Sequence, residues 1–471
     1  MKKRLSSLPS NVVSISFIWS FMFYLLNMNN LFNDHDVFWH IEAGHRIVQE
    51  KSTILNNGWS FTSPNHTWYN ISWLWDLCLY FSEVLFSIKF IYFITAFIYA
   101  LIISLLAHYL LLFKSFKAFN IIFTIFMTTL VLWDFTSPRP YTLTILFSLM
   151  YLILLKKYST NKKTKSLYLL PPIMLIWSNT HGGFIVGCYL LIVYFLCNFK
   201  TINRRFFLVS IVTMLCVFIN PYFHKILNAV LSTTNSDFTK SIDEWQPLSF
   251  GKHQFVFCLY LLFFIGSLNI KNINLTFFDK LNSIVWLLMS LMYIRNIPIF
   301  LIMSSAFFTS NVQSLNVLRA LNIEIKNNDK SGFFLSLVSL LMLSIAFFTG
   351  CWRDVITPYN NPIPAIKFIM HKYPQKKFFN DYGLGGAIIY FSKGNQKVFV
   401  DGRAGTAYPE SVLQEYKNSK FNTSSLISIF KKHKIDGVIS DKNSSISKSL
   451  FGRKNWSLVF NNNDYLIYVK Q

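Results

Sequence analysis

The residues best suited to chemistry are Asp34 and Asp36, two carboxylates one residue apart in an otherwise apolar stretch. Two such carboxylates can share a divalent cation such as Mg²⁺ or Mn²⁺, or one can remove a substrate proton while the other orients it. A structural alternative is that Asp36 caps a helix. We interpret both as candidate catalytic residues and as candidate ligands of a divalent cation, with His40 beside them as a substrate-binding residue. His40 and His45 are five residues apart rather than four, so zinc is not predicted.

Four further polar residues lie beside apolar runs. Arg139 and Arg295 are each next to proline, and a guanidinium there can hold a phosphate through paired hydrogen bonds. The alternative is an arginine that reaches up to lipid headgroups. His181 precedes two glycines and is a candidate substrate-binding residue, as a ligand or hydrogen-bond donor; the alternative is that it only serves the geometry of a tight turn. Glu244 is a second candidate catalytic carboxylate.

Two candidates lie near the C-terminus. Asp381 follows one predicted strand and Arg403 follows another, and loops after strands are where α/β domains place binding sites. We interpret both as candidate substrate-binding residues. Arg403 has a structural alternative, an ion pair with Asp401.

The composition places these residues in a membrane protein. Of the 471 residues, 53% are hydrophobic and only 14% are charged, whereas soluble proteins carry roughly 25% charged residues. Apolar runs long enough to cross the hydrocarbon core recur along the chain. The net charge of +23 comes mostly from lysines and arginines between these runs, which indicates cytoplasmic loops rather than nucleic-acid binding. The six cysteines show no metal-ligand or disulfide spacing.

The positive-inside rule predicts a polytopic α-helical membrane protein with about eleven transmembrane helices and a cytoplasmic, uncleaved N-terminus. Residues 32–71 form the first external loop, and 72–87 are predicted as a surface or re-entrant helix because of Asp76 and Glu83. The predicted spans are 11–31, 89–113, 119–134, 142–156, 167–178, 183–199, 206–220, 254–270, 281–294, 298–311 and 332–350.

This topology places the unusual polar motifs at external span ends. We therefore expect the first loop to form one wall of an external cavity shared with Arg139, His181, Glu244 and Arg295. A transporter would more often place ionisable residues near mid-membrane.

The chain is predicted to divide at residue 350. Residues 1–350 form the transmembrane domain, and 351–471 form a small extracytoplasmic α/β domain because short β-rich runs alternate with amphipathic helices. The predicted strands are 377–380, 397–401, 437–440, 457–460 and 465–470, and the predicted helices are 386–392, 409–418 and 424–433.

With one span, an acidic first external loop, many further spans and an external C-terminal domain, the chain resembles the GT-C superfamily of membrane glycosyltransferases. It also resembles a group of uncharacterised bacterial membrane proteins, with which it shares motifs such as Asp36-Val37-Phe38-Trp39-His40, Arg139-Pro140, His181-Gly182-Gly183 and Arg295-Asn296-x-Pro298. Asn380-Asp381-Tyr382-Gly383 resembles the W-W-D-Y-G signature of oligosaccharyltransferases, but Phe378 and Phe379 replace the tryptophans.

The resemblance implies a catalytic acid at Asp34 or Asp36, and Arg295 or Arg139 as the ligand of a carrier phosphate. It implies transfer of a sugar from a polyprenyl-phosphate carrier to a lipid or glycan acceptor at the external face of a bacterial inner membrane. The alternatives are a surface-polysaccharide ligase or polymerase, and a non-catalytic scaffold or transporter. Membrane lipids and the carrier-linked sugar are the expected partners, and nucleic acid is not.

Overall fold

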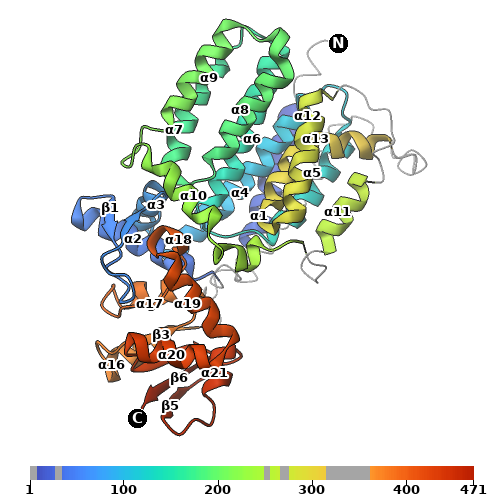
Figure 1. The fold of residues 1–471 in the computed structure, drawn as a ribbon. Coiled ribbons are helices and arrows are strands. Elements are labelled where there is room, and N and C mark those ends of the chain that lie inside the picture. The colour runs from blue at the N-terminus through green and yellow to red at the C-terminus, as the bar shows by residue number, and fades with distance from the viewer. Residues whose placement is uncertain (1–7, 27–33, 249–254, 266–274, 315–360) are drawn as a thin grey trace. The chain divides into compact units, whose positions relative to one another are not determined.

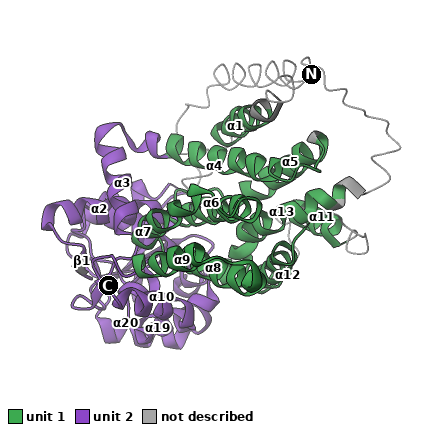
Figure 2. Cartoon of the chain, turned by 90° about the horizontal axis from the view of Figure 1, so that it is seen from above, with its two compact units in different colours: residues 1–28, 92–217, 243–353 green, residues 29–91, 218–242, 354–471 purple. Residues whose placement is uncertain are grey.

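The computed structural model describes residues 8–26, 34–248, 255–265, 275–314 and 361–471 (Figure 1). The chain forms two compact units, each built from separate stretches of sequence (Figure 2). Unit 1 comprises residues 1–28, 92–217 and 243–353, and unit 2 comprises residues 29–91, 218–242 and 354–471. Most of the predicted first external loop therefore belongs to the same unit as the C-terminal segment. The predicted division at residue 350 and the predicted span 332–350 lie outside the described residues.

Unit 1 is helical, and its helices run alongside one another as a bundle (Figure 1). Its α-helices are α1 (Leu8–Leu26), most of α4 (Ile88–Leu111), α5 (Ala118–Trp133), α6 (Tyr141–Thr160), α7 (Leu170–Thr180), α8 (Phe184–Asn198), α9 (Arg204–Cys216), α11 (Phe255–Ile265), α12 (Phe277–Met292) and α13 (Ile297–Ser314). Short 3₁₀ turns lie at Lys165–Leu169 (η2), Phe199–Thr201 (η3), Asp243–Trp245 (η5) and Ile294–Asn296 (η7). Each predicted span that falls on described residues of this unit coincides with one of these helices.

Among the described residues, three helices are long and apolar enough to cross a membrane, at Ile88–Leu111, Tyr141–Thr160 and Phe184–Thr201. Shorter apolar helices include Val12–Leu26, Phe119–Trp133, Val256–Ile265 and Ile294–Ser310. The outward side chains of α9 are apolar too, with Val212 50% and Leu215 59% exposed. Water would leave such a surface unfavourably solvated, whereas lipid covers it. The chain is a membrane protein.

In unit 2, the first loop folds into a helix pair and a small hairpin. Helix α2 (Asp36–Glu50) packs on α3 (Trp73–Leu85), and strands β1 (Ile54–Asn56) and β2 (Thr67–Tyr69) pair antiparallel between them. Gly44 lies against the Asp76 backbone and the Tyr80 side chain, so a larger residue would separate the two helices. The predicted helix at 72–87 is therefore present and ends before α4 begins.

The C-terminal part of unit 2 contains a four-stranded sheet in the order β3-β4-β6-β5. Its strands are β3 (Phe378–Asn380), β4 (Gly437–Asp441), β5 (Trp456–Asn461) and β6 (Tyr465–Lys470); β3 and β4 are parallel, and the other pairs are antiparallel. The helices of unit 2 outside the first loop are α10 (Lys225–Asn235), α16 (Ile363–Lys372), α17 (Gly385–Phe391), α18 (Ala404–Ala407), α19 (Glu410–Phe421), α20 (Thr423–His433) and α21 (Ser445–Leu450), with 3₁₀ turns η4 (Thr239–Ser241) and η8 (Tyr382–Leu384).

The predicted strand at 397–401 is wrong. This segment forms only an isolated parallel bridge between Val398 and Ser60. The Asn380 side chain is the reason: its Oδ1 accepts from Phe399 N at 2.8 Å and its Nδ2 donates to Val400 O at 2.8 Å. Because one amide side chain satisfies these backbone groups, the segment is held beside the end of β3 without extending the sheet.

Candidate functional site

Three of the predicted site residues of unit 1 meet in one ion-pair network. Arg139 Nη1 lies 3.3 Å from Glu244 Oε2, and Arg295 Nη1 lies 3.4 Å from Glu244 Oε1. Trp245 and Tyr141 complete the group, with the Arg295 guanidinium 4.1 Å from the Trp245 ring centre and 5.6 Å from that of Tyr141. We call these five residues the arginine cluster.

Helix ends hold the cluster in place. Arg139 lies just before α6, Arg295 lies in η7 between α12 and α13, and Glu244 and Trp245 lie in η5. Tyr141 Oη donates to the Arg295 backbone oxygen at 2.5 Å. Backbone hydrogen bonds from Ile294 N to Gln246 O and from Leu248 N to Leu291 O fasten the η5 segment to η7 and the end of α12.

Both guanidiniums of the cluster contact the same carboxylate, that of Glu244. The side chains stay accessible, at 35% for Arg139, 21% for Arg295 and 40% for Glu244. Exposed ion pairs of this kind add little to stability. The arrangement instead brings together two guanidiniums, a kind of group that can hold an anion such as a phosphate through paired hydrogen bonds.

His181 lies next to the cluster. Its ring meets the Tyr141 ring edge to face at 5.8 Å, and Nδ1 lies 2.7 Å from Thr144 Oγ1. Gly183 N donates to the same Nδ1 at 3.0 Å, so this nitrogen is the acceptor and a neutral ring carries its proton on Nε2. A side chain at Gly183 would overlap Thr144 and His181, which explains the glycine.

In unit 2, Asp34 and Asp36 lie at the start of α2. Asp36 N donates to Asp34 Oδ1 at 3.2 Å, and His35 rather than Asp36 is the N-cap residue. His35 Nδ1 donates to Gly383 O at 3.1 Å. The helix start is thus bound to the loop that follows β3.

Two glycines of the C-terminal segment allow the start of α2 to approach closely. A β-carbon on Gly402 would overlap the Asp36 carboxylate, and one on Gly386 would lie 2.5 Å from His35 O. Three predicted motifs, at Asp34–His40, Asp381–Gly386 and Asp401–Arg403, therefore come together within unit 2. Whether the arginine cluster shares a cavity with them stays a prediction.

His40 is buried and paired. Its Nδ1 lies 2.5 Å from Asp76 Oδ1, and its ring stacks on Trp39 at 3.6 Å between centres. Asn70 Nδ2 donates to Asp76 Oδ2 at 2.7 Å. Burial raises the pKa of Asp76, and the charge of His40 opposes that rise. His40 is oriented by a fully buried carboxylate.

Arg403 is also fully buried, in a forked ion pair with Asp401. Arg403 Nε lies 2.8 Å from Asp401 Oδ1 and Nη2 lies 2.6 Å from Oδ2, while Nη2 also donates to Asn57 Oδ1 at 2.6 Å. The guanidinium lies over the rings of Trp59 and Trp68. Burial alone would lower the pKa of Arg403, but the charge of Asp401 raises it above its ordinary value. These contacts fasten the first loop to the C-terminal segment.

Asp381 lies in the loop after β3 that also binds His35 through Gly383. Its Oδ2 accepts from Asp441 N at 2.8 Å, and burial raises the pKa of the carboxyl to about 6. It borders a cavity of about 470 Å³ at the ends of β3 and β4.

The part of the chain that the structure describes contains no group of three or more His, Cys, Asp or Glu side chains arranged as a metal site. Asp34 and Asp36 alone offer two carboxylates. Mg²⁺ commonly takes one or two carboxylates and completes its octahedron with water and substrate oxygens, so the role of Asp34 and Asp36 as its ligands stays a prediction.

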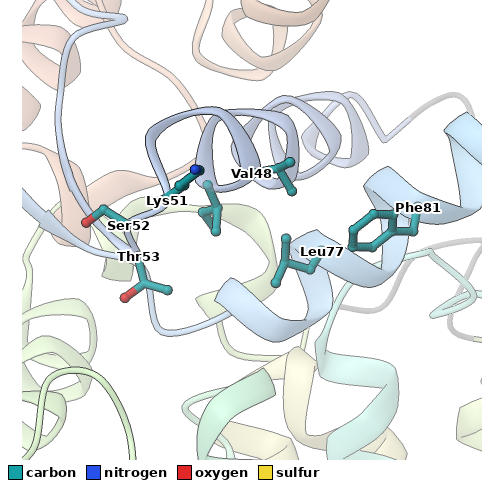
Figure 3. A pocket seen from close by; sticks show the side chains of 7 residues that line it. Val48, Lys51, Ser52, Thr53, Leu77 and Phe81 are labelled. Carbon is teal, nitrogen blue, oxygen red and sulfur yellow. The ribbon is translucent and has the colours of Figure 1, made fainter.

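A second cavity, of about 530 Å³, lies between α2 and α3 (Figure 3). Val48, Leu77 and Phe81 line one part of it, and Lys51, Ser52 and Thr53 line the other. Beyond it, Val84 and Leu85 are 59% and 67% exposed. This amphipathic groove fits the prediction of a surface helix at 72–87.

Several neighbours of the candidate residues were not predicted as site residues. Asp76 was used only to place its helix at the surface, although a carboxylate in an apolar helix is itself a signal for a buried partner. Trp245 directly follows Glu244, and an aromatic next to a charge indicates a cation–π partner. Asp441 and Lys420 lie in ordinary polar stretches that carry no such signal.

The chain is similar to known proteins in its fold and not in its sequence. No protein-family model matches the chain, and no curated protein matches its sequence. The archaeal oligosaccharyltransferase AglB from Archaeoglobus fulgidus, in complex with an inhibitory peptide and a dolichol-phosphate, superposes with a TM-score of 0.59 at 11% identity over 92% of this chain and 69% of that one. An oligosaccharyltransferase of the same organism, tethered to an acceptor peptide with the NVT sequon, gives 0.56 at 12% identity over 99% and 74%.

ArnT from Cupriavidus metallidurans, bound to undecaprenyl phosphate, gives a TM-score of 0.52 at 11% identity over 99% of this chain and 98% of that one. AglB and ArnT are both GT-C glycosyltransferases. The predicted resemblance is thus confirmed, and this chain has the fold of GT-C membrane glycosyltransferases.

Proposed function

We propose that the protein is a glycosyltransferase that moves a sugar from a polyprenyl-phosphate carrier to a lipid or glycan acceptor. The observation that carries this proposal is the convergence of Arg139 and Arg295 on Glu244, which brings two guanidiniums together at accessible helix ends. The GT-C fold supports it, because AglB and ArnT were solved with dolichol-phosphate and undecaprenyl phosphate.

The chemistry assigns a role to each group. Arg139 and Arg295 hold the carrier phosphate through forked hydrogen bonds. The acceptor hydroxyl attacks C1 of the sugar from the face opposite the phosphate, and the C1–O bond breaks with its electron pair leaving on the phosphate. Asp34 or Asp36 takes the hydroxyl proton, as a general base. Glu244 orients the two arginines, and the configuration at C1 is inverted.

A divalent cation, Mg²⁺ or Mn²⁺, would be held by Asp34 and Asp36 and would stabilise charge on the leaving phosphate. Two histidines position other groups. His40, oriented by Asp76, shapes the site beside the aspartates. His181 supports the Tyr141 ring that borders Arg295.

We place the reaction at the external face of a bacterial inner membrane, with the N-terminus in the cytoplasm. The lysine-rich loops of the sequence support this orientation through the positive-inside rule. The α/β part of unit 2 then lies outside the cytoplasm, where membrane lipids and the carrier-linked sugar are its partners.

The test is sugar transfer by the purified protein in liposomes. Polyprenyl phosphates carrying radiolabelled hexoses, N-acetylhexosamines or pentoses are supplied with lipid and glycan fractions of bacterial membranes as acceptors. With the wild type, we expect the label to enter one acceptor fraction. We expect this incorporation to be abolished in each of three variants, Arg295→Ala, Asp34→Asn and Asp36→Asn.

Arg453→Ala and Asp237→Asn are the matched controls, because both residues are exposed side chains of the same types. Full activity in all three site variants would overturn the proposal. A product that contains many repeat units would favour a polysaccharide ligase or polymerase instead. Passage of labelled substrate across sealed vesicles without a covalent product would favour a transporter.

A further inference from the structure

A cavity lined by charged, polar and aromatic residues lies within the α/β part of unit 2, beside the loop that binds His35 through Gly383 O. It encloses about 470 Å³ and is bordered by Asp381, Tyr382, Tyr416, Lys420, Asp441 and Asn443, among others. Drug-sized ligands occupy pockets of roughly 300–1,000 Å³. The cavity is therefore large enough for a small organic molecule.

The topology explains why polar groups gather here. β3 and β4 are neighbouring parallel strands, so their carboxyl ends lie at the same edge of the sheet. Asp381 directly follows β3, and Asp441 ends β4. Open α/β sheets bind their ligands in the crevice beyond the carboxyl ends of such strands.

The carboxylates of this edge are held in fixed orientations. Asp381 Oδ2 accepts from Asp441 N at 2.8 Å, and Asp441 Oδ1 accepts from Asn443 N at 2.7 Å. Each hydrogen bond uses one oxygen of its carboxylate, and no hydrogen bond to the other oxygen is found among the described residues. Hydrogen-bond acceptors thus remain at the cavity.

Aromatic and cationic groups form the rest of the lining. The rings of Tyr382 and Tyr416 lie 6.2 Å apart at 38°, and Tyr416 Oη accepts from Tyr382 N at 2.8 Å. Lys420 Nζ lies 5.0 Å from the Tyr416 ring centre. The cavity therefore combines two carboxylates, one ammonium group, an amide and two aromatic faces.

This set of groups selects among ligand classes. Two carboxylates against one ammonium repel a phosphate or another anion. A ligand rich in hydroxyl groups satisfies the remaining carboxylate oxygens as a donor and Lys420 and Asn443 as an acceptor. The apolar C–H face of a sugar ring also packs on tyrosine.

We propose that this cavity is a saccharide-binding subsite that holds one neutral sugar residue. Its assignment to the acceptor glycan, rather than to a free saccharide, rests on the proposed function. Unit 2 would thus bind the acceptor at the carboxyl ends of β3 and β4.

Binding by the full-length protein in detergent micelles tests the subsite. Saturation-transfer NMR and calorimetry are run with glucose, galactose, mannose, N-acetylglucosamine and their disaccharides, and with inorganic phosphate for comparison. Asn443→Trp is the main variant, since the Asn443 side chain is exposed and only its backbone N takes part in the Asp441 contact. Asn418→Trp, on an exposed position of α19, is the matched control.

We expect at least one saccharide to bind more tightly than phosphate. Asn443→Trp should weaken it at least tenfold by filling the cavity, Lys420→Ala should weaken it several-fold, and Asn418→Trp should leave it unchanged. Saccharide binding that Asn443→Trp and Lys420→Ala leave intact, or no saccharide binding at all, would overturn the inference. Arg295→Ala keeps this binding while it abolishes transfer, so failure of the subsite and failure of the proposed function give different results.

Discussion

The Asp36 carboxylate lies directly against Gly402, so closely that a β-carbon on the glycine would overlap it. One end of this contact is the first acidic motif of the chain and the other lies in the Asp401–Arg403 turn. The candidate base thus contacts a residue more than three hundred positions away in sequence.

We expect Gly402→Ala to push the Asp36 carboxylate aside and to lower sugar transfer strongly. Overpacking at such a contact costs roughly 1–3 kcal/mol, so the melting temperature should also fall. Asn418→Ala is the control, because Asn418 is exposed on α19. Equal transfer rates for the two variants would show that Asp36 is not held by Gly402.

Glu244→Gln should slow transfer while it leaves stability almost unchanged. The ion pairs of Glu244 involve side chains between 21% and 40% exposed, and exposed pairs contribute about 0–1 kcal/mol. If Glu244 orients the two arginines, its loss should weaken carrier binding and raise KM more than it lowers kcat. A loss confined to kcat would instead indicate a direct role in proton transfer.

Asp381 should make stability depend on pH. Its pKa of about 6 lies above its ordinary value because of burial, so the folded protein binds this proton more tightly than the unfolded chain. Its contribution to stability is therefore greatest at low pH and declines as pH rises from about 4 to about 6, by about 3 kcal/mol at most.

Asp381→Asn removes this loss, so its melting temperature should exceed that of the wild type at pH 7.5 and match it near pH 4. Asp237→Asn, which replaces an exposed carboxylate paired with Lys240, should show no such pH-dependent difference. Parallel melting curves for wild type and Asp381→Asn across this range would contradict the assignment.

Arg403→Ala should destabilise unit 2 severely. It leaves the buried Asp401 carboxylate without its counter-charge, and breaking a buried pair from one side costs about 3–5 kcal/mol. Arg403→Lys keeps the charge but cannot make the forked contacts to Asp401 and Asn57, so we expect a smaller loss. Thermal melts that compare both with the exposed Arg453→Ala measure the effect, and a wild-type melt for Arg403→Ala would refute it.

Most of the secondary structure could be predicted because it depends on local pattern. Apolar runs gave the helices of unit 1, and the β-rich runs at 437–440, 457–460 and 465–470 became β4, β5 and β6. The strand predicted at 397–401 failed because the Asn380 side chain binds Phe399 N and Val400 O. The backbone groups of Val398 bind Trp59 O and Phe61 N of the first loop. A side-chain amide that replaces a ladder partner leaves no trace in the alternation of residues.

The candidate site was predictable in its residue types but not in its pairings. Arg139, Glu244 and Arg295 were each selected because a charged residue beside an apolar run is unusual. That one carboxylate bridges both arginines depends on how η5 meets η7, which is a tertiary contact. The same holds for His40, since its partner Asp76 lies on another helix.

The hydrogen bond from Arg403 to Asn57 joins residues that are 346 positions apart, and this separation imposes an order on biosynthesis. At synthesis rates of about 5–20 residues per second, the first loop waits roughly 20–70 s for its partner to be made. During that interval Trp59 and Trp68 lack the guanidinium that later lies over their rings. A nascent chain arrested before residue 403 should therefore leave the first loop open to proteases that the finished protein resists.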